Sequence, residues 1–336
     1  MTRPWETRPD GDGDVIERVC IVGAGVIGSL YAAHLSRVAD VWVLTRRSEH
    51  ARALEANGLR VSGRAEFSGA VHATDDPDEI PAFDVAIVAT KGTGLDAAAT
   101  ALEGRFADAT IVTVQNGLGA ERIVRSHGDW PIVSGVTFMS GTRHDDTHVE
   151  YVLDTETWLG PYNGTPYDRV EELAALIERA GLKARAFPDL RPAQWSKLIF
   201  NATVNAVAAL TGLPHDAHFA AEQESADLGH LVHALMDEGK AVAAAAGIEL
   251  HEDPWEMNVL ATLRGSAHYP SMLEDVEARR PTEIELITGA LVREAGRLDV
   301  PVPLHTALYR LIKAKEAAWQ LETGLSKAGP SKGRTE

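Results

Sequence analysis

Apolar and polar residues follow two different patterns along this chain. In the first half, short runs of β-branched residues alternate with helical stretches, a pattern typical of βαβ units. The clearest strands are predicted at residues 19–22, 41–44, 85–89 and 110–114. A helix predicted over residues 25–37 connects the first two strands, so this unit should form a right-handed parallel crossover.

The remaining apolar runs predict further strands and then a long series of helices. One or two extra strands are expected over residues 59–74. Others are expected toward the far side of the sheet, over residues 133–138, 149–153, 157–159 and 182–187. Beyond about residue 189 the chain reads as almost wholly helical, most clearly over residues 226–246 and 281–298, where apolar residues recur at three- and four-residue intervals.

These patterns predict the fold class: an α/β Rossmann-type dinucleotide-binding domain followed by an all-α C-terminal domain. The length of 336 residues agrees with two domains. The first is expected over residues 17–189 and the second over residues 190–325. Pro, Gly and Asp predict a disordered leader over residues 1–16, and Gly, Lys and Ser predict a flexible tail over residues 326–336.

Composition narrows the range of partners. The formal net charge of −17 disfavours nucleic acid and anionic membranes, because their phosphates would be repelled. The single cysteine, Cys20, excludes an intramolecular disulfide and fits a reducing cytosol. No apolar stretch approaches the ~20 residues that span a bilayer, and residues 1–16 lack the apolar core of a signal peptide. We therefore expect a cytoplasmic protein with small-molecule ligands and no metal.

A glycine-rich turn follows the first predicted strand. It has the G-x-G-x-x-G pattern and consists of Gly23, Ala24, Gly25, Val26, Ile27 and Gly28. In a dinucleotide-binding turn the first glycine permits the tight turn, the second lets the backbone approach a pyrophosphate, and the third lets the helix pack on the strand. The free N–H groups of the helix N-terminus favour phosphate. The alternative is a purely structural glycine turn in another α/β fold.

The end of the second predicted strand favours NADP(H) over NAD(H). An NAD site usually has an acidic residue at this point, which binds the ribose hydroxyls. Here the strand ends in Arg46, Arg47 and Ser48, and Asp40 stands at its opposite end. Arginine can bind a 2′-phosphate through two charge-assisted hydrogen bonds. The alternative is an ordinary pair of solvated arginines.

Polar residues form a stripe on the first helix of the second domain. Lys197, Asn201 and Asn205 follow one another at intervals of four residues, so they share one helix face, and apolar residues occupy much of the remaining surface. Such groups are costly to bury without polar partners, which a substrate would supply. The alternative is that Lys197 extends to solvent and the asparagines bond to neighbouring loops.

A second polar cluster runs from His268 to Glu285. Thr282 could cap a helix that begins here, with Pro281 in its first turn. In that interpretation, Glu283 merely favours the positive end of the helix dipole.

Taken together and in order, these motifs resemble the ketopantoate reductase family over nearly the whole chain. After the glycine-rich turn come an arginine ending the second strand, Lys91 after the third, and Gln115-Asn116-Gly117-Leu118-Gly119 after the fourth. The second half adds W-S-K-L-x-x-N-x-x-x-N, S-M-x-x-D and R-x-T-E-I-E.

The resemblance implies NADPH bound to the Rossmann domain, and a 2-keto acid and a homodimer contact on the helical domain. It assigns the 2′-phosphate contact to Arg46 and places Lys91 and Asn116 beside the cofactor, Asn116 also beside substrate. Lys197 matches the family's general acid and Glu283 its catalytic carboxylate. The substrate-binding positions that it implies are Asn201, Asn205, Ser271 and His268. The implied reaction is reduction of 2-dehydropantoate to pantoate for pantothenate synthesis, with the keto oxygen protonated by the lysine.

Three departures put the substrate in doubt. His215, His268 and Thr288 stand where the family often has asparagine. The imidazoles belong either to the substrate pocket or to surface loops. One alternative is therefore a relative that reduces a different small 2-keto acid. Another is a non-catalytic NADP(H)-binding sensor, which should lack the lysine or the carboxylate. The β-hydroxyacid dehydrogenases share the K-x-x-N helix, but their glycine-rich substrate loop is missing from this sequence.

Overall fold

The structure, a computed structural model, describes residues 16–223, 226–263 and 269–327, with the side chains of the last helix described as far as residue 319. The chain divides into two compact units. Unit 1 comprises Met1–Gln115 and Gly119–Leu190, and unit 2 comprises Asn116–Leu118 and Arg191–Glu336. The short segment Asn116–Leu118 therefore belongs with the helices, although the sequence alone places it in the α/β half.

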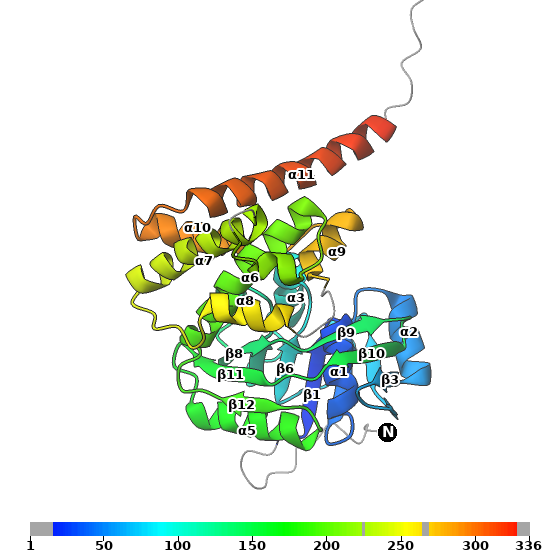
Figure 1. Cartoon of the computed structure of the whole chain (residues 1–336). Helices are drawn as coiled ribbons and strands as arrows, with labels where there is room; N and C mark the ends of the chain where they lie inside the picture. Colours follow the sequence, from blue (N-terminus) through cyan, green and yellow to red (C-terminus); the bar gives the residue numbers. More distant parts are fainter. Residues whose placement is uncertain (1–15, 224–225, 264–268, 328–336) are drawn as a thin grey trace, which may run out of the picture. The chain divides into compact units, whose positions relative to one another are not determined.

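Unit 1 is built on an eight-stranded sheet, drawn in Figure 1. In spatial order its strands are β12 (Ala184–Ala186), β11 (Thr157–Tyr162), β8 (Ile132–Thr137), β7 (Thr110–Thr113), β6 (Val85–Val88), β1 (Arg18–Val22), β2 (Asp40–Leu44) and β5 (His72–Thr74). All neighbours are parallel except β8 and β11. The six strands from β5 to β8 reproduce the doubly wound order of dinucleotide-binding sheets, so the Rossmann prediction is confirmed.

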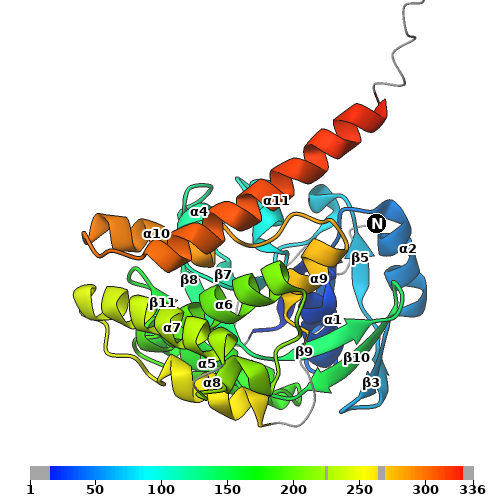
Figure 2. The ribbon, with the colours of Figure 1, turned by 45° about the horizontal axis from the view of Figure 1, so that its top comes forward.

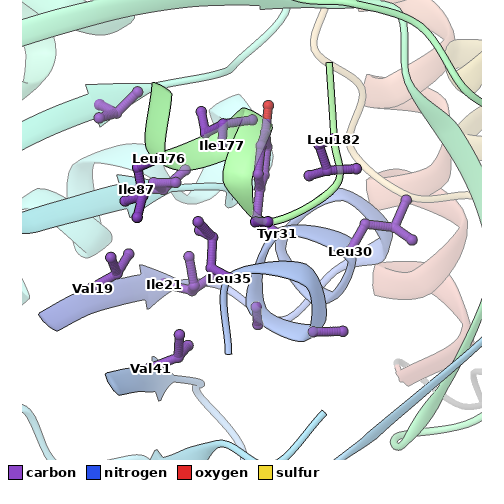
Figure 3. Packing of buried hydrophobic residues seen from close by; sticks show 14 of the residues in the cluster. Val19, Ile21, Leu30, Tyr31, Leu35, Val41, Ile87, Leu176, Ile177 and Leu182 are labelled. Carbon is purple, nitrogen blue, oxygen red and sulfur yellow. The ribbon is translucent and has the colours of Figure 1, made fainter. Parts of the chain in front are cut away.

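The core of unit 1 follows from the alternation of side chains along its strands. Val19 and Ile21 of β1 enter one hydrophobic cluster, and Cys20 and Val22 enter another, because successive side chains point to opposite faces. Figure 3 shows the first cluster. There the strand residues meet Leu30, Tyr31 and Leu35 of helix α1 (Val26–Leu35) and Leu176 and Ile177 of α5 (Tyr167–Arg179). Cys20 is thus an inert core residue, and burial raises the pKa of its thiol.

The remaining helices of unit 1 are short. They are α2 (Ser48–Asn57), α3 (Leu95–Leu102) and α4 (Ala120–Arg125), with the 3-10 turns η1 (Pro77–Glu79) and η2 (Gly92–Gly94).

A second, four-stranded sheet packs on the other side of α1. Its order is β4 (Phe67–Gly69), β3 (Leu59–Gly63), β10 (His148–Leu153) and β9 (Ser140–Arg143). The prediction that residues 149–153 extend the main sheet is therefore wrong, and residues 59–74 form three strands rather than one or two. Local patterns identify strands, but they do not reveal which sheet a strand joins.

Unit 2 is helical. Its elements are α6 (Arg191–Thr211), η3 (Ala217–Ala220), α7 (Asp227–Ala245), α8 (Pro254–Thr262), α9 (Ser271–Glu277), α10 (Thr288–Arg297) and α11 (Pro303–Lys327). Helix α6 is central, since α7, α8, α9, α10 and α11 all pack against it. Figure 2 shows α11 running alongside α10. The last two residues of helix α11, Ser326 and Lys327, lie within the predicted tail. Among the described residues no helix is long and apolar enough to cross a membrane.

The helix predicted over residues 281–298 begins later than the pattern indicates. Helix α10 starts at Thr288, and the preceding residues form turns in which the N–H groups of Leu286 and Ile287 bond to the carbonyl of Glu283. Thr282 is therefore not a helix cap and Glu283 does not lie at a helix N-terminus. Thr282 instead bonds to Glu316 of α11, which holds this segment out of the helix.

Candidate active site

The glycine-rich turn joins β1 to α1. Gly23 has φ +102°, and a Cβ on Gly28 would lie 1.9 Å from the carbonyl oxygen of Gly23, so both positions require glycine. A Cβ on Gly25 would meet no atom within 4 Å. The backbone at Gly25, where α1 begins, thus faces open space that a phosphate could occupy.

Gln115 ties the strand ends beside this turn. Its side-chain amide donates to the carbonyls of Val88 and Thr90 at 2.7 and 3.0 Å. Thr90 in turn packs on Gly23, because a Cβ there would lie 2.7 Å from the Thr90 methyl group. Among the described residues, the buried Thr90 Oγ1 and Gln115 Oε1 have no hydrogen-bond partner, which fits a site that a polar ligand completes. The sequence motif included Gln115 ahead of the Asn-Gly pair, but gave it no role in the site.

The two arginines that follow β2 differ in their surroundings. Arg47 pairs with Asp146, and Ser48 donates to Asp75. Arg46 is exposed, and no hydrogen bond or ion pair involves it within the described parts of the chain. It is thus the arginine of the pair available to a phosphate. Lys91 is also exposed and immediately precedes η2, after β6.

The polar stripe of α6 gathers a cluster within unit 2. Lys197 and Asn201 are each 8% exposed, and Asn205 is 6% exposed. Asn201 donates to Asn116 Oδ1 at 3.5 Å, and the amide of Asn116 donates to Glu283 Oε2 at 3.3 Å. Lys197, Glu283, Asn116 and Asn201 thus belong to one buried polar group assembled from three distant parts of the chain.

Burial and charge act on Lys197 in opposite directions. Burial lowers its pKa to about 8, and the negative charge of Glu283 opposes the fall. The alternative that Lys197 extends to solvent is therefore wrong. A lysine with this pKa is mostly protonated at neutral pH, yet it releases its proton much more readily than an ordinary lysine.

The Gln-Asn-Gly sequence explains how Asn116 reaches this cluster. Gly117 has φ +98°, and a Cβ there would lie 1.8 Å from the carbonyl oxygen of Leu286. The N–H of Leu118 donates to that same oxygen at 2.9 Å. Only glycine allows this close approach, which places Asn116 beside the segment that carries Glu283.

Other predicted residues lie outside the hydrogen-bonded cluster. Ser271 is half-buried at the start of α9. His268 lies outside the described residues. His215 lies neither in the cluster nor on a surface loop: it is 2% exposed, packs edge-on against Phe219 and bonds to Asn258 at 2.8 Å. Thr288 is buried and donates to the carbonyl of Ala202 on α6. Among the described residues no group of acidic, histidine or cysteine side chains could hold a metal.

A glycine-rich turn after the first strand of a doubly wound sheet in one unit, and a buried lysine with a carboxylate in the other, are typical of an oxidoreductase built from a Rossmann unit and a helical unit. Residues 19–164 match the family model described as ketopantoate reductase PanE/ApbA, and residues 189–316 match the model of that family's C-terminal part. The chain therefore belongs to the ketopantoate reductase family.

Individual relatives agree with this assignment. A 2-dehydropantoate 2-reductase from Pyrococcus horikoshii is 28% identical over 301 residues, which cover 89% of this chain and 98% of the relative. The structure of a PanE/ApbA family ketopantoate reductase from Ralstonia eutropha JMP134 is 27% identical with a TM-score of 0.82, over 90% and 99% of the two chains. The structure of a D-mandelate dehydrogenase with NADH and anilino(oxo)acetate has a TM-score of 0.79 over 90% and 99% of the two chains, and at 23% identity this likeness shows the fold alone.

Proposed function

We propose that the protein reduces 2-dehydropantoate to pantoate with NADPH. The observation that carries the proposal is the buried cluster of Lys197, Glu283, Asn116 and Asn201, in which an acid of pKa about 8 stands among groups able to hold a polar substrate. The names of the relatives support the same substrate. A sensor would not need a buried lysine, which is costly to the fold.

A bound reduced nicotinamide dinucleotide supplies the hydride. The hydride would go to C2 of the keto acid, and the cofactor would be left oxidised. Lys197 would give its proton to the keto oxygen, which leaves a hydroxy acid and a neutral lysine. A protonated lysine also stabilises the developing alkoxide before the proton moves. Glu283 keeps Lys197 protonated at neutral pH and can accept a hydrogen bond from the substrate hydroxyl. Asn116 and Asn201 can orient the substrate, with Asn205 and Ser271 as further proposed contacts.

The residues for the cofactor are those of unit 1. Gly23 to Gly28 would receive the pyrophosphate, Arg46 the 2′-phosphate, and Lys91 would lie beside the cofactor. The open space at Gly25 and the unpaired polar atoms of Thr90 and Gln115 support this fit. We also propose a homodimer formed through the helical unit and action in the cytoplasm, in pantothenate synthesis. Sedimentation of the purified protein tests the dimer.

Steady-state assays over a panel of keto acids test the substrate. We expect 2-dehydropantoate to be preferred by several orders of magnitude over the 2-keto acid lacking its hydroxyl, because polar groups that bind the hydroxyl would be left unpaired. A preference for an aromatic keto acid such as benzoylformate would instead favour a D-2-hydroxy acid dehydrogenase. Lys197→Ala should lower kcat by about 10²–10⁴-fold while cofactor binding persists. Normal turnover by this variant would eliminate Lys197 from the mechanism.

Direct binding measurements test the cofactor. A hydrogen bond to a charged group contributes about 1.5–3 kcal/mol, so Arg46→Ala should weaken NADPH binding by roughly 10–100-fold and leave NADH binding unchanged. Arg52→Ala is a matched control, since Arg52 is exposed on α2 and pairs with Glu49. Equal affinity of the unaltered protein for both cofactors would refute the preference for NADPH.

A further inference from the structure

Glu283 lies on an irregular segment, not on a helix. Its own backbone carbonyl accepts from Leu286 and Ile287, so residues 283–287 form turns before α10 begins. Turns of this kind fix a side chain less firmly than a helix does, unless their backbone is anchored from outside. The position of the Glu283 carboxylate therefore depends on what holds the residues around it.

Helix α11 supplies the anchor on one side. Glu316 accepts two hydrogen bonds through Oε1, one from the N–H of Thr282 at 2.8 Å and one from its hydroxyl at 2.7 Å. Thr282 is 3% exposed and directly precedes Glu283. The same hydroxyl oxygen accepts from the N–H of Ile284 at 3.3 Å, on the other side of Glu283. Glu316 thus fixes both neighbours of Glu283 in sequence.

The other side of the segment is anchored through Glu285. Tyr309 and Lys313 of α11 bind its carboxylate at 3.0 and 3.1 Å, and Arg293 of α10 binds it at 3.2 Å. Lys313 also pairs with Glu316 at 3.3 Å. Helices α10 and α11 pack against each other, and both contribute side chains that bind Glu285. Glu285 is half-exposed, whereas Glu316 has a side chain only 14% exposed. Bonds to the more buried carboxylate are less screened by water, so Glu316 is the stronger anchor.

We propose that Glu316 is a positioning residue for the reaction. By holding Thr282, it fixes the Glu283 carboxylate where its charge acts on the amine of Lys197. This inference rests on the proposed function for its catalytic meaning, but the placement itself can be measured without turnover. Glu316 is far along the last helix, and its side chain bonds to Thr282 and pairs with Lys313. It therefore acts through Thr282.

The proton affinity of Lys197 reports the position of Glu283. Among the ionisable groups of the described chain, Glu283 is the one whose charge raises the pKa of Lys197. The titratable side chains that bind this segment are Tyr309, Lys313 and Glu316 from α11 and Arg293 from α10. Competitive acetylation of the cofactor-free protein over a pH range, read at Lys197 by mass spectrometry, gives the midpoint of its titration.

We expect Glu283→Gln to lower this midpoint by about one pH unit, because an opposite charge is lost. Glu316→Ala should lower it in the same direction by roughly half as much or more, and in the Glu283→Gln background it should cause no further change. Glu316→Gln should restore most of the effect, because its amide oxygen can still accept from Thr282. Glu294→Ala is the matched control, since Glu294 pairs with Arg297 on α10 and does not touch the Glu283 segment.

Turnover provides the second readout. Glu316→Ala should lower kcat by about 10–100-fold, with the affinity for NADPH unchanged, because a displacement of about 1 Å can cost this much. Thr282→Val, which removes only the hydroxyl, should change the midpoint and kcat in the same direction if Glu316→Ala fails to fold. An unchanged midpoint and kcat in Glu316→Ala, with a loss of stability like that of Glu294→Ala, would overturn the inference. A shifted midpoint in a protein that reduces no keto acid would support the positioning and refute the proposed function.

Discussion

Replacing Lys197 with methionine should stabilise the protein while destroying its activity. Methionine has a similar length and no charge, so it can fill the same space on α6 without the cost of burying an amine. Burial lowers the pKa of Lys197 from 10.5 to about 8. At about 1.4 kcal/mol for each factor of ten in proton affinity, this difference corresponds to about 3 kcal/mol. That is the upper limit of the gain, since Glu283 loses its counter-charge at the same time.

The stability gained by Lys197→Met should depend on pH. Below pH 8 the lysine is protonated in both the folded and the unfolded state, so folding bears the full free-energy cost of burying a charged amine. Between pH 8 and 10.5 the unfolded chain binds more protons at this position than the folded chain, so the stability contributed by Lys197 rises with pH. Above pH 10.5 both forms are neutral. The stability difference between Lys197→Met and the unaltered protein should therefore be largest at pH 7 and shrink steadily across that window.

Urea unfolding followed by tryptophan fluorescence measures the difference, because Trp195 on α6 is buried two residues from the substitution. Lys197→Ala is the comparison variant, because it removes the charge but leaves a cavity. A Lys197→Met protein that is less stable than the unaltered protein at pH 7, or a difference that does not change with pH, would refute the argument that Lys197 is held in a desolvated site at a cost to the fold.

Three further predictions concern the frame around the site. Glu238→Ala should cost about 1–2 kcal/mol, because its carboxylate caps α11 by accepting from the N–H groups of Leu304 and His305. Burial tends to raise the pKa of Glu238, but the hydrogen bonds to the imidazole of His305 and to these two N–H groups lower it overall. The contribution of Glu238 to stability is therefore present above the ordinary glutamate pKa and should be lost on acidification in urea titrations. His215→Asn should leave the KM for the keto acid unchanged from about pH 5.5 to 7.5, near the ordinary histidine pKa, and a pH-dependent KM that this variant abolishes would place His215 in the substrate pocket. Gly117→Ala should lower kcat sharply with NADPH affinity retained, because a Cβ would collide with Leu286 and displace Asn116, and normal turnover would argue against that close approach.

The fold was largely predictable because its signals are local. Strands buried on both faces read as continuous apolar runs, and the turn from Gly23 to Gly28 has a pattern that few other structures need. The sheet to which residues 148–153 belong was not predictable, since that choice depends on pairing with Leu59–Gly63, far away in sequence. The late start of α10 also depends on a distant residue, because Thr282 is held by Glu316, 34 positions away.

The candidate site was predictable only where residues share one helix. Lys197 and Asn201 could be grouped by spacing alone. Asn116 and Glu283 are 167 positions apart, and only the family resemblance connected them with the lysine before the structure brought them within 3.3 Å. Gln115 gave no periodic signal, since its role is to bond two strand-end carbonyls. The burial of His215 was not predictable, because a histidine in a sequence looks the same whether it lies on a surface loop or is buried.

The burial of Lys197 and the anchoring of Glu283 have to be understood together. Burial alone would lower the pKa of Lys197 further, so a smaller fraction of the amine would carry the proton that the alkoxide needs. The charge of Glu283 limits the fall in pKa, but a charge on a loose turn would act weakly and variably, since the interaction decreases with distance. A fixed carboxylate therefore raises the pKa of Lys197 more reliably than a mobile one would. The bonds from Glu316 to Thr282 and from α10 and α11 to Glu285 provide this rigidity outside the site, where no substrate has to be accommodated.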